Sequence, residues 1–166
     1  MRLLRQGLGG IVLAALVASA CATQTRSGAA RPASDFARSL SLSMAWGRAL
    51  SAGDTSAKAD FTLTNTGSAA FDGCFGPSWG VSVIVGDHDA GYSVRADHPR
   101  CDEKVALLPG QKIVWSKTVP LSGLHEGTAK VTGWVKVVDP MACQQPADCH
   151  ETSVATSPMT VAVGVR

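Results

Sequence analysis

The sequence predicts an all-β domain of antiparallel strands, and three observations support this prediction. Apolar residues alternate with polar ones at a period of two in several runs, which is the spacing of a half-buried strand and not of a helix. Gly, Pro, Asn and Asp punctuate the chain between these runs. No run has the spacing of a credible amphipathic helix. Six or seven short strands of this kind predict a β-sandwich, with a small barrel as the structural alternative.

The clearest signal lies in residues 107–138, which contain two long alternating runs separated by turn residues. In the first run Ile113, Trp115 and Val119 fall on one face, and in the second run the residues from 129 to 138 alternate in the same way. We expect these two runs to organise the fold, with the remaining strands packed around them.

Further strands are expected before and after this segment. Their predicted ranges, in order, are 40–46, 59–64, 79–85, 92–96 and 159–165. The run 79–85 has apolar residues on both faces, which favours a central position in a sheet. The run 92–96 is short and is expected near an edge. Residues 139–158 give no clear signal.

Three phrases of the sequence carry a resemblance to a known fold family. They are FTLTNTG at 61–67, LPGQ at 108–111 and GTAKVTG at 127–133, and they resemble strand and turn phrases of bacterial immunoglobulin-like sandwiches, among them the domain similar to the BsuPI proteinase inhibitor. The resemblance implies an immunoglobulin-like antiparallel β-sandwich of about seven strands. Where such domains often carry Tyr after Gly-Thr, this chain has Ala129, so a tyrosine-corner hydrogen bond is unavailable there.

Residues 1–21 have the layout of a bacterial secretory signal peptide with a lipobox-like end. Basic residues precede an apolar run at 11–17 that is too short to span a bilayer. Cys21 follows small residues, which resembles the lipobox of bacterial lipoproteins and makes Cys21 the expected site of lipidation. Ala18 stands where Leu is usual, and ordinary cleavage before Thr23 also fits the sequence.

After the signal, residues 22–37 are small and polar, so we expect a flexible tether, and residues 38–166 are expected to form one domain. The residue after Cys21 is Ala22 and not Asp, which resembles the sorting pattern of outer-membrane lipoproteins. The expected location is therefore the bacterial cell envelope, as an outer-membrane lipoprotein facing the periplasm. A periplasmic or secreted protein is the alternative.

Charge argues against nucleic acid as a partner. Loss of Arg2 and Arg5 with the signal reduces the 15 Lys and Arg residues to 13, which equals the 13 Asp and Glu residues. A nucleic-acid binder needs clustered basic residues for phosphate contacts, and this sequence has no basic stripe. We expect a protein partner in the envelope and a membrane contact through the lipid.

Four cysteines remain after Cys21, an even number in an exported chain, which favours two disulfides. Three pairings are possible. We expect Cys74 to pair with Cys101 and Cys143 with Cys149, because each pair brackets loop-like sequence.

A soft metal site is the alternative use of the second pair. Cys143, Cys149, His150 and Met141 are ligands suited to Cu(I). Their spacing fits no zinc or cupredoxin pattern, and oxidised cysteines cannot bind metal. Disulfides are therefore favoured, and no metal or other cofactor is expected.

Two enzyme-like signals have plain explanations. Residues 76–80 match G-x-S-x-G around Ser78, but the motif needs a strand-to-helix elbow, and here a β-strand follows. His88 and His98 lie beside Asp residues and are expected in polar surface turns. For His125 the sequence suggests no partner residue. We expect no catalytic activity.

The Trp residues divide by strand parity. Trp46 and Trp115 are in register with aliphatic neighbours and are expected in the core, whereas Trp134 lies on the polar side of its strand. Trp134 is expected either to be covered by the second disulfide loop or to be exposed for a partner. Together with Gln144 and Gln145 of that loop, it is the candidate partner-binding surface.

The predicted function is therefore that of a non-catalytic binding or interaction module of the cell envelope. The resemblance implies a proteinase inhibitor as the first alternative, which would present a rigid exposed loop at 71–77 or at 143–149. A periplasmic copper-handling protein is the second alternative.

Overall fold

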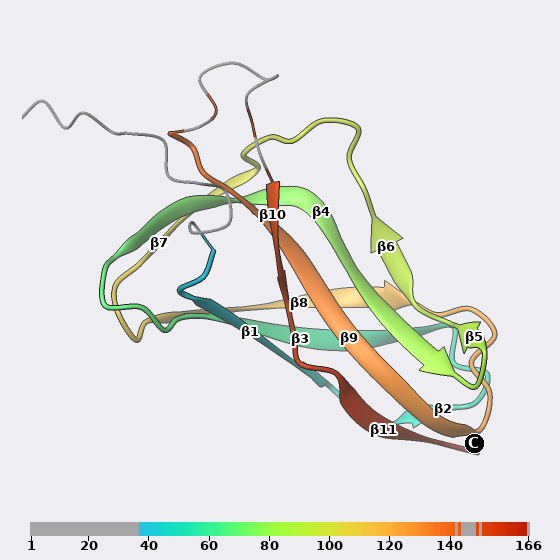
Figure 1. Cartoon of the computed structure of the whole chain (residues 1–166). Coiled ribbons are helices and arrows are strands. Elements are labelled where there is room, and N and C mark those ends of the chain that lie inside the picture. The colour runs from blue at the N-terminus through green and yellow to red at the C-terminus, as the bar shows by residue number, and fades with distance from the viewer. Residues whose placement is uncertain (1–36, 142, 144–148, 150, 166) are drawn as a thin grey trace, which may run out of the picture.

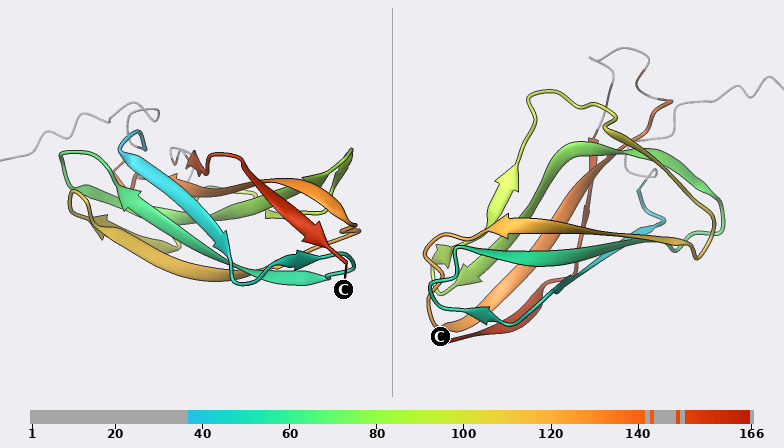
Figure 2. Two further views of the ribbon diagram at one scale, coloured as in Figure 1. Left: turned by 90° about the horizontal axis from the view of Figure 1, so that it is seen from below. Right: turned by 180° about the vertical axis from the view of Figure 1, so that it is seen from behind.

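The protein is an all-β sandwich. The structure is a computed structural model that describes residues 37–141, 143, 149 and 151–165. Figures 1 and 2 show two layers of strands facing each other. The described strands, in chain order, are β1 (Leu40–Trp46), β2 (Leu50–Ser51), β3 (Ser56–Asn65), β4 (Phe71–Val85), β5 (His88–Asp89), β6 (Tyr92–Val94), β7 (Glu103–Leu107), β8 (Lys112–Pro120), β9 (Gly127–Val138), β10 (Glu151–Ala155) and β11 (Met159–Gly164).

The first sheet has the order β1-β3-β8, and both of its pairs are antiparallel. Its strands follow the period-two rule of the sequence. In β3 the residues alternate between buried and less buried positions along the whole strand, and Phe61 and Leu63 are fully buried. This sheet therefore presents one apolar face to its partner.

The second sheet is built on β4 and β9, which pair antiparallel over most of their length. The other edge of β9 pairs with β11 and β10, and the other edge of β4 pairs with β5, β6 and β7. β2 joins β11 in parallel, as the one parallel pair among the described strands. The orders β1-β3-β8 and β11-β9-β4 are consistent with an immunoglobulin-like topology.

The central position expected for the run 79–85 is confirmed, since this run forms the second half of β4. The two runs in residues 107–138 become β8 and β9, and these strands belong to different sheets. They are thus parts of opposite walls of the sandwich and not neighbours in one sheet.

A single core lies between the sheets and explains the aromatic residues placed there from the sequence. Trp115 stacks on the fully buried Phe61 with a centroid distance of 5.5 Å, and Trp46 is partly buried against the same core. A Cβ at Gly133 would lie 2.9 Å from the Phe61 ring. Glycine at this position of β9 therefore leaves the space that the Phe61 side chain fills.

The start of β4 corrects one expectation. Residues 71–77 were expected as a candidate inhibitory loop, but they belong to β4 and pair with β7 and β9. A β-bulge between Phe75 and Trp79 shifts the register where the two halves of the strand meet. This segment is therefore not a free loop, and the expectation of an exposed inhibitory loop there was wrong.

Both predicted disulfides are confirmed. Cys74 bonds Cys101 with an S–S distance of 2.06 Å, and Cys143 bonds Cys149. Cys74 is fully buried on β4, whereas Cys101 is exposed in the connection between β6 and β7. The first disulfide thus ties that connection to the second sheet.

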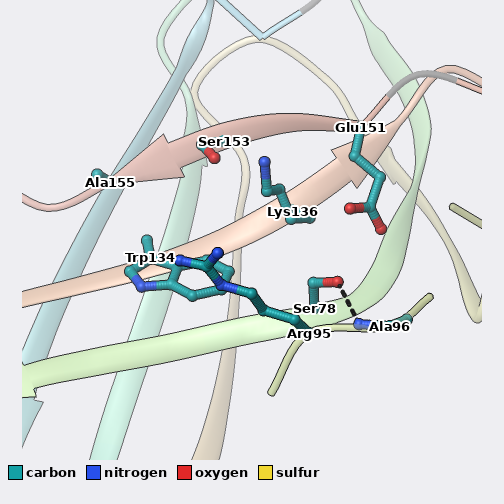
Figure 3. A pocket seen from close by; sticks show the side chains of 8 residues that line it. All are labelled: Ser78, Arg95, Ala96, Trp134, Lys136, Glu151, Ser153 and Ala155. Carbon is teal, nitrogen blue, oxygen red and sulfur yellow. Dashed lines mark hydrogen bonds between the residues drawn. The ribbon is translucent and has the colours of Figure 1, made fainter. Parts of the chain in front are cut away.

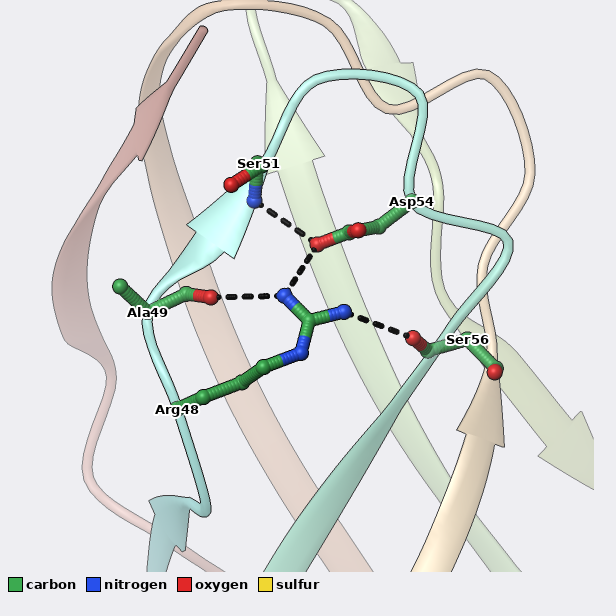
Figure 4. Close-up of polar contacts among 5 residues, drawn as sticks. All are labelled: Arg48, Ala49, Ser51, Asp54 and Ser56. Atoms are coloured by element: carbon green, nitrogen blue, oxygen red, sulfur yellow. Dashed lines mark hydrogen bonds and ion pairs between the residues drawn. The ribbon is translucent and has the colours of Figure 1, made fainter. Parts of the chain in front are cut away.

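A buried carboxylate fixes the turn after β2 (Figure 4). Asp54 is 2% exposed, and its Oδ2 accepts hydrogen bonds from the Arg48 guanidinium at 2.7 Å and from the Ser51 backbone N–H at 2.8 Å. The Arg48 guanidinium also donates to the Ala49 carbonyl. The pKa of Arg48 is raised by its hydrogen bond to Asp54 and by the charge of that carboxylate. The contact is structural, because it closes a turn.

Several sequence predictions lie outside the described residues: the signal peptide, Cys21, residues 22–36 of the tether, Gln144, Gln145 and His150. Ala37, the last residue of the expected tether, is buried, and its carbonyl accepts a hydrogen bond from the Leu40 N–H. Within the described part of the chain, no helix has the length and apolarity needed to cross a membrane.

Candidate functional site

A groove lies on the outer face of the second sheet, over β9 and β10 (Figure 3). This open groove has a volume of about 540 Å³, and we call it the Trp134 groove. A second cavity of about 200 Å³ adjoins it, and both cavities share Trp134 and Arg95. The residues that line the Trp134 groove are Ser78, Arg95, Ala96, Trp134, Lys136, Glu151, Ser153 and Ala155.

Strand parity brings the groove residues of β9 and β10 together. Val135 and Val137 of β9 point into the core, so Trp134 and Lys136 point outward. In the β9–β10 register Ala155 is opposite Trp134, and Ser153 is opposite Lys136. Directly opposite residues of paired strands share a face, so these side chains form one surface.

The Trp134 indole is backed by a glycine on the neighbouring strand. Gly80 of β4 is the register partner of Trp134, and a Cβ at Gly80 would lie 2.7–2.8 Å from three indole atoms. The indole therefore lies against the Gly80 backbone, and Trp134 is only partly buried. Of the two sequence alternatives, the described residues show a Trp packed on the sheet beneath it and lining an open groove. Residues 144–148 of the loop lie outside the described residues.

Two cations and one carboxylate line the groove together with this indole. Arg95 follows β6 and extends toward Trp134 in Figure 3, and Lys136 and Glu151 lie further along the groove. Among the described residues, neither Arg95 nor Lys136 takes part in an ion pair. The described part of the groove thus has a surplus of positive charge.

Glu151 carries an unusual oxygen. Its Oε1 is buried and has no hydrogen-bond partner among the described residues. A Cβ at Gly76 would lie 2.7 Å from this oxygen, so the glycine on the bulged part of β4 makes room for it. A buried oxygen without a hydrogen-bond donor is costly in free energy.

Ser78 has a positioning role. It is 3% exposed, and its Oγ accepts a hydrogen bond from the Ala96 N–H at 3.1 Å. This bond holds the segment after β6 against β4, and Arg95 lies in that segment. The Ser of the G-x-S-x-G match is therefore a buried residue within β4, whereas the strand was expected to begin only after it, and it supports the groove.

Asp89 lines the adjoining cavity and is held by hydrogen bonds. Its carboxylate accepts hydrogen bonds from the backbone N–H groups of Val83 and Gly91 and from the Ser82 hydroxyl, all within 2.9 Å. Burial alone would raise the pKa of Asp89, but these hydrogen bonds and the charge of His88 lower the pKa below its ordinary value. Asp89 thus organises the β4–β5 turn.

The histidines lie apart from the groove. His88 is exposed and its Nε2 lies 2.7 Å from the Ser122 carbonyl, while the rings of His88 and His125 are 6.4 Å apart. His98 is exposed. In the described ranges no three His, Cys, Asp or Glu side chains gather as a metal site would require. Cys143 and Cys149 form a disulfide with each other, so they do not provide the thiolates that the copper alternative requires.

The fold and the groove define the chain as an all-β sandwich domain with a polar, Trp-containing surface groove. Neither a protein-family profile nor a curated protein matches the sequence. Among solved structures, the chain is similar to the sporulation control protein Spo0M from Bacillus subtilis, with 12% identity and a TM-score of 0.42 over 77% of this chain; it spans 50% of the Spo0M chain.

It is also similar to the putative ApaA protein from Bordetella pertussis, with 16% identity and a TM-score of 0.42, over 75% of this chain and 91% of that one. At these values neither likeness bears on what this protein binds.

Sequence reasoning found Trp134 but missed Arg95, Glu151 and Ser153. Glu151 and Ser153 lie in the segment that gave no strand signal, because β10 has only one buried residue, Val154, in its five. Arg95 reaches the groove through the pairing of β6 with β4, which no local pattern encodes. Lys136 could be placed beside Trp134 from parity alone.

Proposed function

We propose that the protein is a non-catalytic binding module of the bacterial cell envelope, held at the membrane by lipid on Cys21, and that the Trp134 groove is its binding site. The main support is Trp134 itself. One side of the indole packs on Gly80, and the residue lines a groove whose cations have no ion-pair partner among the described residues. Partly exposed aromatic residues beside Arg are typical of binding surfaces.

Two further observations favour binding over the alternatives. The Ser78 hydroxyl is buried and accepts a backbone hydrogen bond, which argues against its use as a nucleophile. Residues 71–77 form a paired strand, which weakens the case for an inhibitory loop, and the Cys143–Cys149 bond weakens the case for copper. The two disulfides suit an oxidising compartment such as the envelope.

The test is cosedimentation of the full mature chain carrying Cys21→Ser, which has no lipid anchor, with isolated envelope fractions. Trp134→Ala removes the indole, and we expect at least tenfold weaker binding, since truncation of a central aromatic residue commonly costs about 2 kcal/mol or more. Lys130→Gln is the matched control, because Lys130 lies on the same face of β9 but outside the groove. Equal binding by Trp134→Ala and wild type, at equal thermal stability, would exclude the groove.

A further inference from the structure

The groove combines groups that match one class of ligand. Its indole offers a flat apolar surface, Arg95 and Lys136 offer hydrogen-bond donors with positive charge, and the Glu151 carboxylate that lines the groove offers an acceptor. Sugar rings have an apolar face of C–H groups that stacks on indole, and their hydroxyls both donate and accept. A saccharide can therefore use the indole and both kinds of polar group at once.

The net charge of the groove indicates which kind of saccharide would bind. Two cations and one carboxylate leave one positive charge in excess among the described residues that line the Trp134 groove itself. The adjoining cavity adds the carboxylate of Asp89, which already accepts three hydrogen bonds within the protein. Neither cation is neutralised by an ion pair among the described residues. A guanidinium pairs with a carboxylate through two parallel hydrogen bonds, and charge-assisted bonds are stronger than neutral ones. An acidic sugar is thus favoured over a neutral one.

The spacing of the groups suits a ligand longer than one ring. Trp134 and Lys136 are two residues apart on β9, which places their Cα atoms about 7 Å apart along the strand. Arg95 and Trp134 also line the adjoining cavity, so the surface continues past the indole in the other direction. An oligosaccharide would follow this surface with one ring over Trp134.

An extended peptide is less well matched. Along the groove β9 pairs with β4 on one edge and β10 on the other, and the Trp79–Val81 part of β4 pairs with both β9 and β6. The backbone groups beneath the groove are therefore already used in the sheet, and a peptide could not add there as a strand. It would have to bind through side chains alone.

We propose that the Trp134 groove binds an acidic oligosaccharide, with one sugar ring on the Trp134 indole, its carboxylate between Arg95 and Lys136, and a hydroxyl donating to Glu151. This inference rests on the proposed function and names the ligand class of the same site.

The experiment is isothermal titration of the full mature chain with three probes: trigalacturonate, its methyl ester, and a hexapeptide of alternating Glu and Gly. The ester keeps the rings and removes the charge. We expect trigalacturonate to bind at least tenfold more tightly than the ester and more tightly than the peptide. Tighter binding of the peptide, or equal binding of acid and ester, would overturn the proposal, as would the absence of binding by every probe.

Variants assign the contacts. Arg95→Gln and Lys136→Gln should each weaken trigalacturonate binding about tenfold and leave the ester unchanged, whereas Trp134→Ala should weaken both. Lys130→Gln is the charge-matched control and should bind like wild type. Arg95 is exposed and lies outside the strands, so its variant tests the site even if Trp134→Ala unfolds. Unchanged acid binding by both cation variants would refute the placement of the carboxylate.

The result also separates this inference from the proposed function. If no saccharide binds but envelope fractions still bind in a Trp134-dependent manner, the ligand class is wrong and the binding module stands. If Trp134→Ala leaves envelope binding unchanged, the proposed site itself fails.

Discussion

At the scale of single residues, Gly80 and Trp134 depend on each other. They are opposite in the register of β4 and β9, and the indole occupies the space where a Cβ at position 80 would lie. An aromatic residue that covers a cross-strand glycine shields its backbone and compensates for the low strand propensity of glycine. The binding surface is therefore supported by a residue that has no side chain.

Gly80→Val is expected to force the Trp134 indole off the sheet. Overpacking of this kind costs about 1–3 kcal/mol, so the thermal midpoint should fall and the Trp fluorescence spectrum should change. Gly164→Ala is the control, because a Cβ at Gly164 meets no atom within 4 Å. An unchanged spectrum and midpoint in Gly80→Val would contradict the packing of the indole on Gly80.

Asp89 is a second single residue with a testable role, because its hydrogen-bonded carboxylate should make the stability of the fold depend on pH. Its folded pKa lies below the value of about 3.9 expected for an unfolded Asp. A depressed folded pKa contributes stability that is fully present above about pH 3.9 and is lost as the pH falls through the folded value. The hydrogen bonds from Val83, Gly91 and Ser82 are the source of this stability.

The expected result is a smaller loss of thermal midpoint between pH 6 and pH 3 for Asp89→Asn than for wild type, measured by circular dichroism. Asp87→Asn is the control in the same turn. A loss in Asp89→Asn as large as that of wild type would show that this carboxylate does not contribute to the acid sensitivity.

At the scale of elements, the Cys74–Cys101 disulfide joins β4 to the connection that follows β6. The sequence separation is 27 residues, for which loop closure in the unfolded chain gives about 3.5 kcal/mol of stabilisation. Because Cys74 is fully buried and Cys101 is exposed, the two single variants should differ.

Cys101→Ala should lower the thermal midpoint by loss of the crosslink, and Cys74→Ala should lower it slightly more, since it also leaves a small cavity. The double variant should cost little more than Cys74→Ala, because both changes remove the same bond. Calorimetry with a free-thiol titration measures this. Additive losses in the double variant would mean that the two cysteines do not act as one crosslink.

At the scale of the whole molecule, β9 and β10, which carry much of the Trp134 groove, lie side by side in the second sheet (Figure 1). A lipid on Cys21, followed by the polar residues after it, would hold the domain near a membrane surface. We therefore propose the membrane location together with the binding site in the Trp134 groove.

Cys21→Ser is expected to abolish lipid labelling and to release the protein from the membrane fraction into the soluble fraction. Ala22→Ser, which keeps Cys21, is the control and should stay with the membrane. An unaltered protein that takes up no lipid label and begins at Thr23 would show that the chain is secreted without an anchor.

The sequence alone determined the all-β class, the longer strands and the disulfide pairs, but not the strands β2, β5, β7 and β10. Strand alternation is local, so the core faces of β1, β3, β8 and β9 could be read from parity, and so could the outward position of Trp134. The cysteine pairs followed from their number and from the loops that they bracket. The predicted strand ends were less accurate, since the predicted run 79–85 is only the second half of β4.

Only the tertiary structure decided which residues surround Trp134. β10 has one buried residue and no clear pattern, so its position beside β9, and with it Glu151 and Ser153, depends on pairing between strands. Arg95 reaches the indole through β6 and the Ser78 hydrogen bond to Ala96. The glycines at 76 and 80 matter through the side chains opposite them. Cross-strand register is a non-local property, and period-two patterns in single strands do not encode it.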